Sequence, residues 1–291
     1  MSNKYAFLTS CLLLLFLLSA CTPSGKKQIL VFSKTNGFRH ESIEAGNTAI
    51  EMLGQENNFA VVVTEADSVF SDATLSQYDA IVFLNTSGEL LDPTQRIAFR
   101  RYIQAGGGFV GIHGAATTEY SWPWYNQLLG AQFDDHPAIQ EARIQVDDPN
   151  HLSTQHLDAE WIRTDEWYNF KNRYPHTQVL LSLDESSYDG GKHPDGHPIA
   201  WYHEYDGGRS FYTALGHTKE SYSEPAFLQH VLGGIQYVMG DGTLDYDRET
   251  IIPEPSRFEK VVLDYYLDEP MELEMLPDGR LLFNERHGRI N

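Results

Sequence analysis

The sequence contains only two cysteines in 291 residues, and both lie near the N-terminus, at Cys11 and Cys21. The rest of the chain therefore has no thiol that could form a disulfide, bind a metal or act as a nucleophile. Basic residues are also scarce, because 21 lysines and arginines stand against 41 aspartates and glutamates, for a formal net charge of -20. This balance argues against the basic surface that nucleic-acid binding requires, so we expect no nucleic-acid partner.

A long hydrophobic run is lacking as well, because the run from Leu12 to Leu18 is too short to cross a bilayer as a helix. Lys4 precedes this run, and the tetrapeptide that ends at Cys21 resembles a bacterial lipobox. We therefore predict a lipoprotein signal peptide over residues 1–20, lipidation of Cys21 and a short tether over residues 21–27. The predicted location is the bacterial cell envelope, lipid-anchored at the periplasmic face of the outer membrane. An ordinary secretory signal is the alternative.

Strand-like and helix-like segments alternate in the first half of the chain. Short apolar runs typical of buried strands lie at residues 28–33, 59–64, 80–84 and 109–112. Ser42 is placed to cap a helix that follows the first run, and Asp92 with Pro93 and Gln95 forms a capping-box sequence that starts another. This alternation predicts an α/β fold whose mainly parallel sheet is covered by helices on both faces.

The second half is more antiparallel in character. Residues 141–146 alternate apolar and polar side chains, and residues 199–215 resemble a hairpin with a glycine turn. A helix with an apolar stripe is expected over residues 225–239. From residue 241 the composition becomes acidic and irregular, and we interpret residues 241–291 as a linker followed by the truncated start of a β domain. An appendage packed on the first domain is the alternative.

Three histidines follow segments that are expected to be strands, namely His40, His113 and His217. In an open α/β sheet, ligands bind at the carboxyl ends of the strands, where these side chains could converge. Convergent histidines suit either a divalent metal or proton transfer near neutral pH. No local metal-binding signature such as HExxH is present, so the spacing gives no support for a metal. For His113, which lies on a glycine-flanked turn, a hydrogen bond within a packed turn is the alternative.

Carboxylates and aromatic residues are adjacent at two places. Asp165 and Glu166 precede Trp167, and Asp184-Glu185 lies close to Tyr188. Carboxylates can hydrogen-bond the hydroxyls of a sugar while aromatic rings pack on its apolar faces. A carboxyl group beside a tryptophan can also acquire a raised pKa and serve as an acid or base. Solvated acids beside core aromatics are the alternative.

Four further residues have two interpretations each. Arg39 could bind an anionic or hydroxyl-rich ligand or form a surface salt bridge, and Trp122 could form a wall of the site or belong to the core. His136 and His197 each precede a proline, which is typical of turns, although either side chain could face the cleft.

Several of these segments are motifs that occur in the same order in one family. They are Lys34–Ile43, Gly106–Ala116, Trp122–Tyr125, His136–Pro137, Asp165–Phe170, Asp184–Tyr188, His197–Trp201 and Gly208–Thr218. Together they resemble the ThuA-like domain, a family named after a trehalose-utilisation protein, over about residues 28–240. The resemblance implies a relative of the class I glutamine amidotransferases. The expected fold is therefore a flavodoxin-like three-layer α/β/α sandwich with a mainly parallel central sheet and antiparallel additions in its second half.

In amidotransferases a cysteine occupies the turn where His113 stands, so amidotransferase chemistry is not expected here. The resemblance implies an extracytoplasmic, carbohydrate-related protein, and we favour an enzyme that acts on a sugar or keto-glycoside in sugar catabolism. The alternative is a non-catalytic carbohydrate-binding or scaffolding domain that serves a fused or neighbouring sugar dehydrogenase. The residues expected to be catalytic are His113, His217, Asp165 and Glu166. Those expected to bind substrate are Thr35, Arg39, His40, Trp122, Trp167, Tyr188 and His197. The candidate ligands of a divalent metal are His40, His113 and His217.

The tail from Phe258 resembles the opening of a glucose/sorbosone dehydrogenase β-propeller, mainly through Leu276–Arg280. A sugar dehydrogenase or propeller protein is therefore an expected partner, together with a small carbohydrate ligand and the membrane reached through the N-terminal lipid anchor. Too little of a propeller is present for a quinone cofactor to be assigned to this chain.

Overall fold

The computed structural model describes residues 26–247, 269–276, 280–288 and 290. The predicted signal peptide and Cys21 lie outside these residues. Contacts divide the chain into two compact units, Met1–Ile251 and Ile252–Asn291. In the described part of the chain, none of the helices has the length and apolar character that a bilayer span requires.

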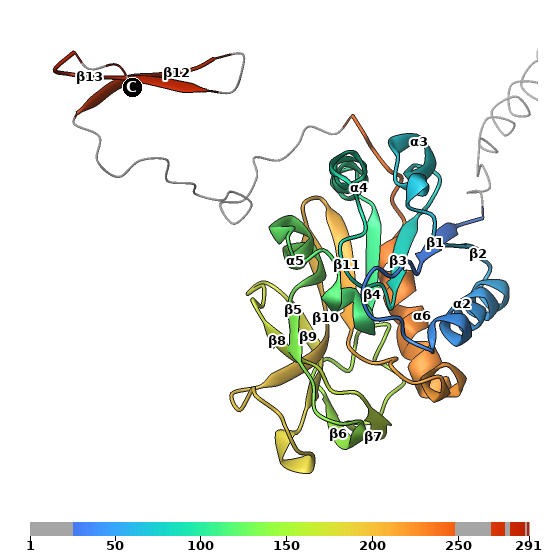
Figure 1. Cartoon of the computed structure of the whole chain (residues 1–291). Helices are drawn as coiled ribbons and strands as arrows, with labels where there is room; N and C mark the ends of the chain where they lie inside the picture. The colour runs from blue at the N-terminus through green and yellow to red at the C-terminus, as the bar shows by residue number, and fades with distance from the viewer. Residues whose placement is uncertain (1–25, 248–268, 277–279, 289, 291) are drawn as a thin grey trace, which may run out of the picture. The chain divides into compact units, whose positions relative to one another are not determined.

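A nine-stranded sheet forms the centre of the first unit, with the strand order β2-β1-β3-β4-β11-β10-β9-β6-β7 (Figure 1). The first five strands in this order run parallel to one another, and they are β2 (Ala60–Thr64), β1 (Gln28–Phe32), β3 (Ala80–Leu84), β4 (Gly108–Ile112) and β11 (Gly208–Thr213). The other four pair antiparallel, and they are β10 (His197–Tyr205), β9 (Gln178–Leu183), β6 (Gln140–Val146) and β7 (Glu160–Asp165). The expectation of a parallel sheet with antiparallel additions in the second half is confirmed.

Helices cover both faces of the parallel strands, as expected for three layers. In Figure 1, α2 (Ile43–Glu56) and α6 (Pro225–Met239) lie on one face. The other face carries α3 (Asp72–Leu75), α4 (Pro93–Gln104) and α5 (Pro123–Leu129). A small second sheet pairs β5 (Gln132–Asp135) with β8 (Asn169–Lys171).

The two expected helix starts have different outcomes. The capping box of α4 is present, because Asp92 accepts a hydrogen bond from the backbone of Gln95 and the backbone of Asp92 donates one to the Gln95 side chain. Ser42 does precede α2, but its side chain does not cap the helix. Its hydroxyl instead donates to the carbonyl of Gly216 and accepts from the amide of Asn85, which ties the start of α2 to the loop after β11.

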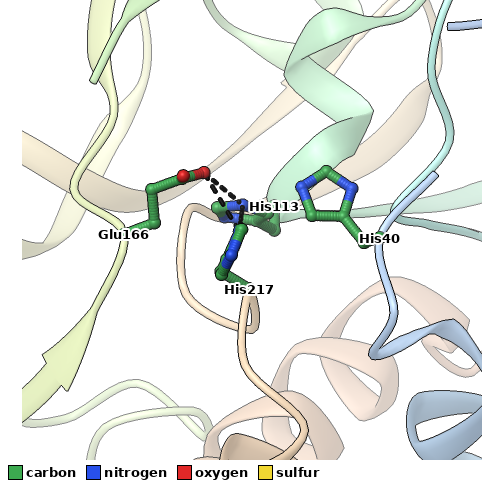
Figure 2. A group of neighbouring side chains, drawn as sticks. All are labelled: His40, His113, Glu166 and His217. Carbon is green, nitrogen blue, oxygen red and sulfur yellow. Dashed lines mark hydrogen bonds and ion pairs between the residues drawn. The ribbon is translucent and has the colours of Figure 1, made fainter. Parts of the chain in front are cut away.

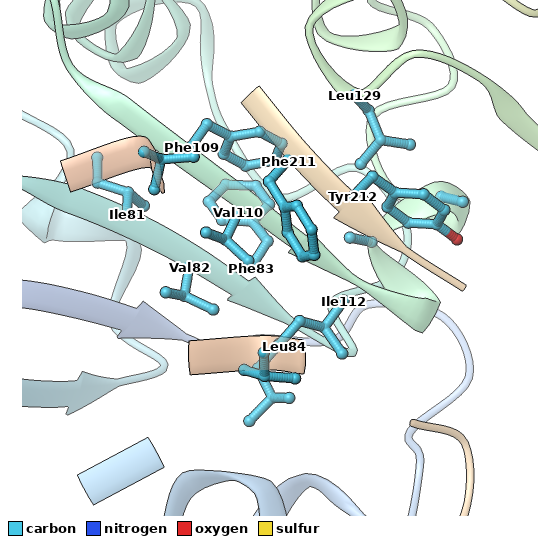
Figure 3. Packing of buried hydrophobic residues seen from close by; sticks show 14 of the residues in the cluster. Ile81, Val82, Phe83, Leu84, Phe109, Val110, Ile112, Leu129, Phe211 and Tyr212 are labelled. Atoms are coloured by element: carbon cyan, nitrogen blue, oxygen red, sulfur yellow. The ribbon is translucent and has the colours of Figure 1, made fainter. Parts of the chain in front are cut away.

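Aromatic side chains fill the core between the sheet and the helices of one face. Figure 3 shows Phe83 of β3 and Phe109 of β4, whose ring centroids lie 5.3 Å apart. Phe83 also stacks on Phe99 of α4 and on Tyr125 of α5. Strands β3 and β4 are buried along their whole length, which explains why both appear in the sequence as uninterrupted apolar runs.

The close approach of α6 to the loop before β7 depends on Gly233. A Cβ at this position would overlap the backbone of Leu152 and Ser153, which cannot move aside as a flexible side chain can. We expect Gly233→Ala to lower the free energy of unfolding by about 1–3 kcal/mol, as overpacking does in other cores. Urea unfolding measures this loss. Gly242→Ala is the matched control, because its Cβ would meet no atom. Equal stability of both variants would contradict the packing argument.

Two buried histidines outside the sheet edge make stability depend on pH. Burial lowers the pKa of His203 to about 4 and that of His230 to about 3. Both rings are therefore neutral in the folded chain, while in the unfolded chain they bind protons below about pH 6.5. The unfolded state then holds more protons, so stability is complete above about pH 6.5 and falls as the pH is lowered.

When the pH is lowered from 7 to 5, each of these histidines should reduce the free energy of unfolding by about 2 kcal/mol. Urea unfolding at the two pH values measures the total loss. His203→Gln keeps a donor for the carbonyl of Gln127, which the ring contacts at 3.0 Å, but cannot titrate. This variant should therefore lose less stability than the wild type over the same pH range. An identical loss in both proteins would mean that His203 titrates normally.

The second unit is described as a hairpin of two antiparallel strands, β12 (Pro270–Met275) and β13 (Leu281–Glu285). Met271, Leu273 and Met275 of β12 are exposed apolar side chains. The resemblance of this segment to a propeller stays a prediction, as do the domain boundaries at residues 28–240 and 241–291.

Candidate functional site

The carboxyl end of β4 holds His113 in an unusual backbone conformation. Its φ of 44° lies in the left-handed region, which residues other than glycine seldom adopt. The side chain is fully buried, and its Nδ1 atom lies 2.6 Å from the carbonyl oxygen of Ala214. A carbonyl can only accept, so Nδ1 carries the proton of the neutral ring. The lone pair of Nε2 therefore points away from Ala214.

Three other side chains gather around Nε2 of His113 (Figure 2). Nδ1 of His217 lies 3.2 Å from it, and Oε2 of Glu166 lies 3.3 Å from it. Oε2 of Glu166 is also 3.0 Å from Nδ1 of His217. The ring of His40 packs edge-on against both imidazoles, with ring centroids 4.8 Å from His113 and 5.1 Å from His217. We call these four residues the histidine–glutamate cluster.

The fold brings the cluster together from four separate segments. His40, His113 and His217 follow β1, β4 and β11, whose carboxyl ends share one edge of the sheet. Glu166 follows β7, which three other strands separate from β11 in the sheet order. Its contact with His217 means that the antiparallel half curves towards the carboxyl ends of the parallel strands. The three histidines that the sequence places after strands do converge.

The cluster has a defined charge pattern. Burial would raise the pKa of Glu166, but its close contacts with the imidazoles of His113 and His217 hold it well below its ordinary value. Burial would lower the pKa of His217, but the hydrogen bond and charge of Glu166 raise it. Burial, together with the nearby rings of His113 and His217, lowers the pKa of His40 to about 2. At neutral pH the cluster therefore combines a carboxylate, a neutral imidazole at His40 and a basic imidazole at His217.

Residues 28–238 of the chain match the model of the ThuA family, described as trehalose utilisation. The chain belongs to the ThuA family. No curated protein matches it significantly. Among solved structures, a ThuA-like protein from Bacteroides uniformis is 24% identical with a TM-score of 0.62, over 73% of this chain and 91% of that chain. One from Parabacteroides merdae is 17% identical with a TM-score of 0.64, over 75% of this chain and 91% of that chain. At these identities the two structures support the fold of the ThuA domain.

Asp165 was expected to be catalytic, but its carboxylate faces the backbone of the ThuA domain. It accepts hydrogen bonds from the backbone N–H groups of Glu166, Gly216 and His217, at 3.0, 2.9 and 3.2 Å. The guanidinium of Arg163 lies 3.3 Å from its Oδ2 atom. Asp165 is thus a positioning residue, because it joins the end of β7 to the loop that carries His217.

The aromatic residues expected to bind substrate belong to the core of the ThuA domain instead. Trp167 is fully buried and donates to the carbonyl of Gln140. Trp122 is also buried, and it stacks on Trp124 beneath the guanidinium of Arg96. Neighbouring side chains therefore occupy the space that a sugar would need beside either ring.

Tyr188 and His197 also have structural partners. Nδ1 of His197 lies 2.9 Å from the Tyr188 hydroxyl and 2.8 Å from Oε1 of Glu185, while Nε2 lies 2.9 Å from the carbonyl of Tyr168. Both nitrogens of this buried ring are therefore occupied. These contacts hold the strand ends around Tyr168, and the expected role of both residues in substrate binding stays a prediction.

Arg39 and Thr35 lie on the loop that carries His40. Arg39 is paired with Glu44 and Glu65 at 2.9 and 2.8 Å, so the salt-bridge alternative describes it better than ligand binding. Thr35 forms a parallel bridge with Ser87 and so fixes the loop against the residues after β3.

Two residues that were not among the expected site residues also contact the cluster. Nδ1 of His136, which follows β5, lies 3.1 Å from Oε1 of Glu166, and its side chain is 42% exposed. The ring of Tyr168 lies 4.1 Å from the ring of His113 and covers one side of it. The proline after His136 predicted a turn, and this contact fits the alternative that its side chain faces the cleft; Tyr168 belonged to an acidic-aromatic segment whose position the sequence did not indicate.

Proposed function

We propose that this ThuA-family protein is an enzyme that acts on a sugar or keto-glycoside, with His113, Glu166 and His217 as its catalytic groups. The observation that carries the proposal is the meeting of three histidines and one carboxylate at the carboxyl edge of the sheet. A domain that only binds carbohydrate needs hydrogen-bonding groups and aromatic faces, but has no need for several titratable groups within contact of one another. The trehalose-utilisation family supports carbohydrate as the substrate class.

The chemistry that suits these groups is proton transfer at a carbon next to a keto group. A keto group at C3 of a glycoside acidifies the C2 hydrogen, and a base of the cluster can remove that proton to give an enolate across C2 and C3. The C1–C2 double bond then forms as the enolate returns to the ketone and the bond between C1 and the glycosidic oxygen breaks, while an acid of the cluster protonates the departing oxygen. The Glu166–His217 pair joins a carboxylate to an imidazole of raised pKa, so it offers a proton acceptor and a proton donor 3.0 Å apart.

Access from solvent is compatible with this role. The side chain of His217 is 19% exposed, and His136 beside Glu166 is more exposed still, while Glu166 and His113 lie deeper. A substrate would therefore approach past His136 and His217 and meet Glu166 below them. His136 is suitably placed to contact a substrate hydroxyl.

The proposed setting is the periplasmic face of the outer membrane, with the chain held by a lipid on Cys21. This location is supported by the lipobox-like sequence. A keto-glycoside must be supplied by oxidation of a sugar hydroxyl, so a sugar dehydrogenase is the proposed partner. The resemblance of the tail to the start of a dehydrogenase propeller supports the same partner.

The proposal is tested by incubating the purified protein with a panel of glycosides and the corresponding 3-keto-glycosides, and measuring release of the leaving sugar or alcohol. We expect turnover of keto-glycosides, and a loss of about 10²- to 10⁴-fold in His113→Asn. Asparagine tolerates the left-handed backbone at this position, so the fold should survive. His176→Asn, at an exposed position, is the control. Saturable sugar binding without turnover would favour the non-catalytic domain, and turnover unchanged in His113→Asn would overturn the site.

A further inference from the structure

We infer that the histidine–glutamate cluster is a binding site for one divalent first-row transition-metal ion. The inference rests on the proposed function in that it takes the same cluster to be the working site. Metal binding can nevertheless be measured without any substrate, so the two proposals can fail separately.

The spacing of the donor atoms fits a metal ion. Nε2 of His113, Nδ1 of His217 and Oε2 of Glu166 form a triangle with sides of 3.2, 3.0 and 3.3 Å. Ligands about 2.0–2.1 Å from a tetrahedral ion stand about 3.3 Å from one another. The triangle is therefore already close to the size that one ion requires. His40 contributes a fourth donor, since one ligand atom from each of the four residues lies within 4.8 Å of the others.

When both rings are neutral, hydrogen bonds cannot pair all three atoms of this triangle. The proton of His113 is on Nδ1, where it is donated to Ala214. If the proton of His217 is on Nδ1, it can be donated to Glu166 or to His113, which leaves Nε2 of His113 and Oε2 of Glu166 facing each other as lone pairs at 3.3 Å. Burial makes such a contact costly. A cation between the three atoms removes the repulsion at once.

The surroundings of the cluster resemble the outer contacts of known metal sites. Ligating histidines usually donate their other ring N–H to a carbonyl or carboxylate, as His113 does to Ala214. Asp165 holds the backbone of His217, and His136 contacts the second oxygen of Glu166. Nδ1 of His40 is buried and has no hydrogen-bond partner among the described residues.

The donor set also restricts the kind of ion. Three imidazoles and one carboxylate suit zinc, iron, cobalt or nickel, whereas magnesium and calcium prefer all-oxygen sites. No cysteine lies beyond Cys21 to favour softer ions. The ion would act near His217, the most exposed member of the cluster, where solvent or a sugar oxygen could reach it.

The test uses the full chain, stripped with a chelator that is then removed. The protein is titrated with Zn²⁺ and with Co²⁺, and bound metal is measured after equilibrium dialysis, with the intensity of the visible bands of Co²⁺ reporting its coordination geometry. We expect one equivalent per chain. His217→Ala and Glu166→Gln should each weaken binding by about 100-fold or more, since loss of an outer contact alone costs about 10- to 100-fold. His176→Ala and Glu141→Gln, both at exposed positions, should bind as the wild type does.

Thermal unfolding of the metal-free variants and the metal-free wild type separates loss of a ligand from loss of the fold. Absence of saturable binding in folded wild-type protein, or full retention of binding in both cluster variants, would overturn the inference. Metal binding without turnover of any glycoside would leave the inference standing and contradict the proposed function. Turnover of a glycoside by protein shown to be metal-free would leave the proposed function standing and contradict the inference of a metal site.

Discussion

Glu166→Gln should reduce turnover of a keto-glycoside by about 10²- to 10⁴-fold while leaving the protein folded. The carboxylate contacts His113, His217 and His136, so it joins three of the imidazoles at the site. Glutamine has nearly the same shape but carries no charge and cannot accept a proton. The raised pKa of His217, which depends on Glu166, should fall back in the variant.

The measurement is kcat and KM for the wild type and the variant, with far-ultraviolet circular dichroism as the check on folding. Glu141→Gln makes the same chemical change at an exposed position of β6 and is the matched control. The His217 ring can be followed by NMR titration in the metal-free protein. Activity of Glu166→Gln within a few-fold of the wild type would remove the carboxylate from the mechanism.

Asp165→Asn should lower the free energy of unfolding by about 3–5 kcal/mol, because it removes one partner of a buried ion pair. Asp165 is fully buried and accepts three backbone N–H groups, and Arg163 is buried beside it. The side-chain amide of asparagine can accept only some of these hydrogen bonds, because its NH2 group would face backbone N–H donors. The guanidinium would also lose its ion pair with Asp165, although it would keep its contacts with Glu224 and the hydroxyl of Ser221.

Urea unfolding near pH 7 measures this loss, and Asp147→Asn at an exposed position should change stability by less than about 0.5 kcal/mol. Any loss of activity in Asp165→Asn should follow displacement of His217 and so be smaller than that of Glu166→Gln. Unchanged stability would show that Asp165 is not a structural anchor. A greater loss of activity than in Glu166→Gln would restore the catalytic role first expected for Asp165.

The neighbouring residues Asp165 and Glu166 show why the sequence could predict the site only in part. Both are acids next to Trp167, and the sequence treats them alike. Successive side chains at the end of a strand point in opposite directions, so one can face the cluster only if the other does not. Which one does so depends on how the antiparallel strands curve, and that curvature arises from packing between segments far apart in the chain.

The aromatic residues illustrate a second limit. Trp122, Trp167 and Tyr188 have the residue types of a sugar-binding surface, but burial is a property of the packed domain. Large aromatic side chains bury much apolar area, so core positions compete with ligand sites for the same residue types. His197 was ambiguous for a similar reason, because a proline neighbour indicates a turn without indicating which partners the two ring nitrogens meet.

The sequence by itself determined the class of the fold, because apolar runs of strand length alternate with segments that have helix caps and the apolar period of a helix. It also determined that no thiol lies beyond Cys21, and that His40, His113 and His217 each follow a segment with the pattern of a strand. Only the tertiary structure decided that Glu166 completes this group, that Asp165 supports it from behind and that His113 presents Nε2 to it. The physical reason is that strand ends are set by local patterns, whereas side-chain direction, burial and tautomer depend on contacts across the whole domain.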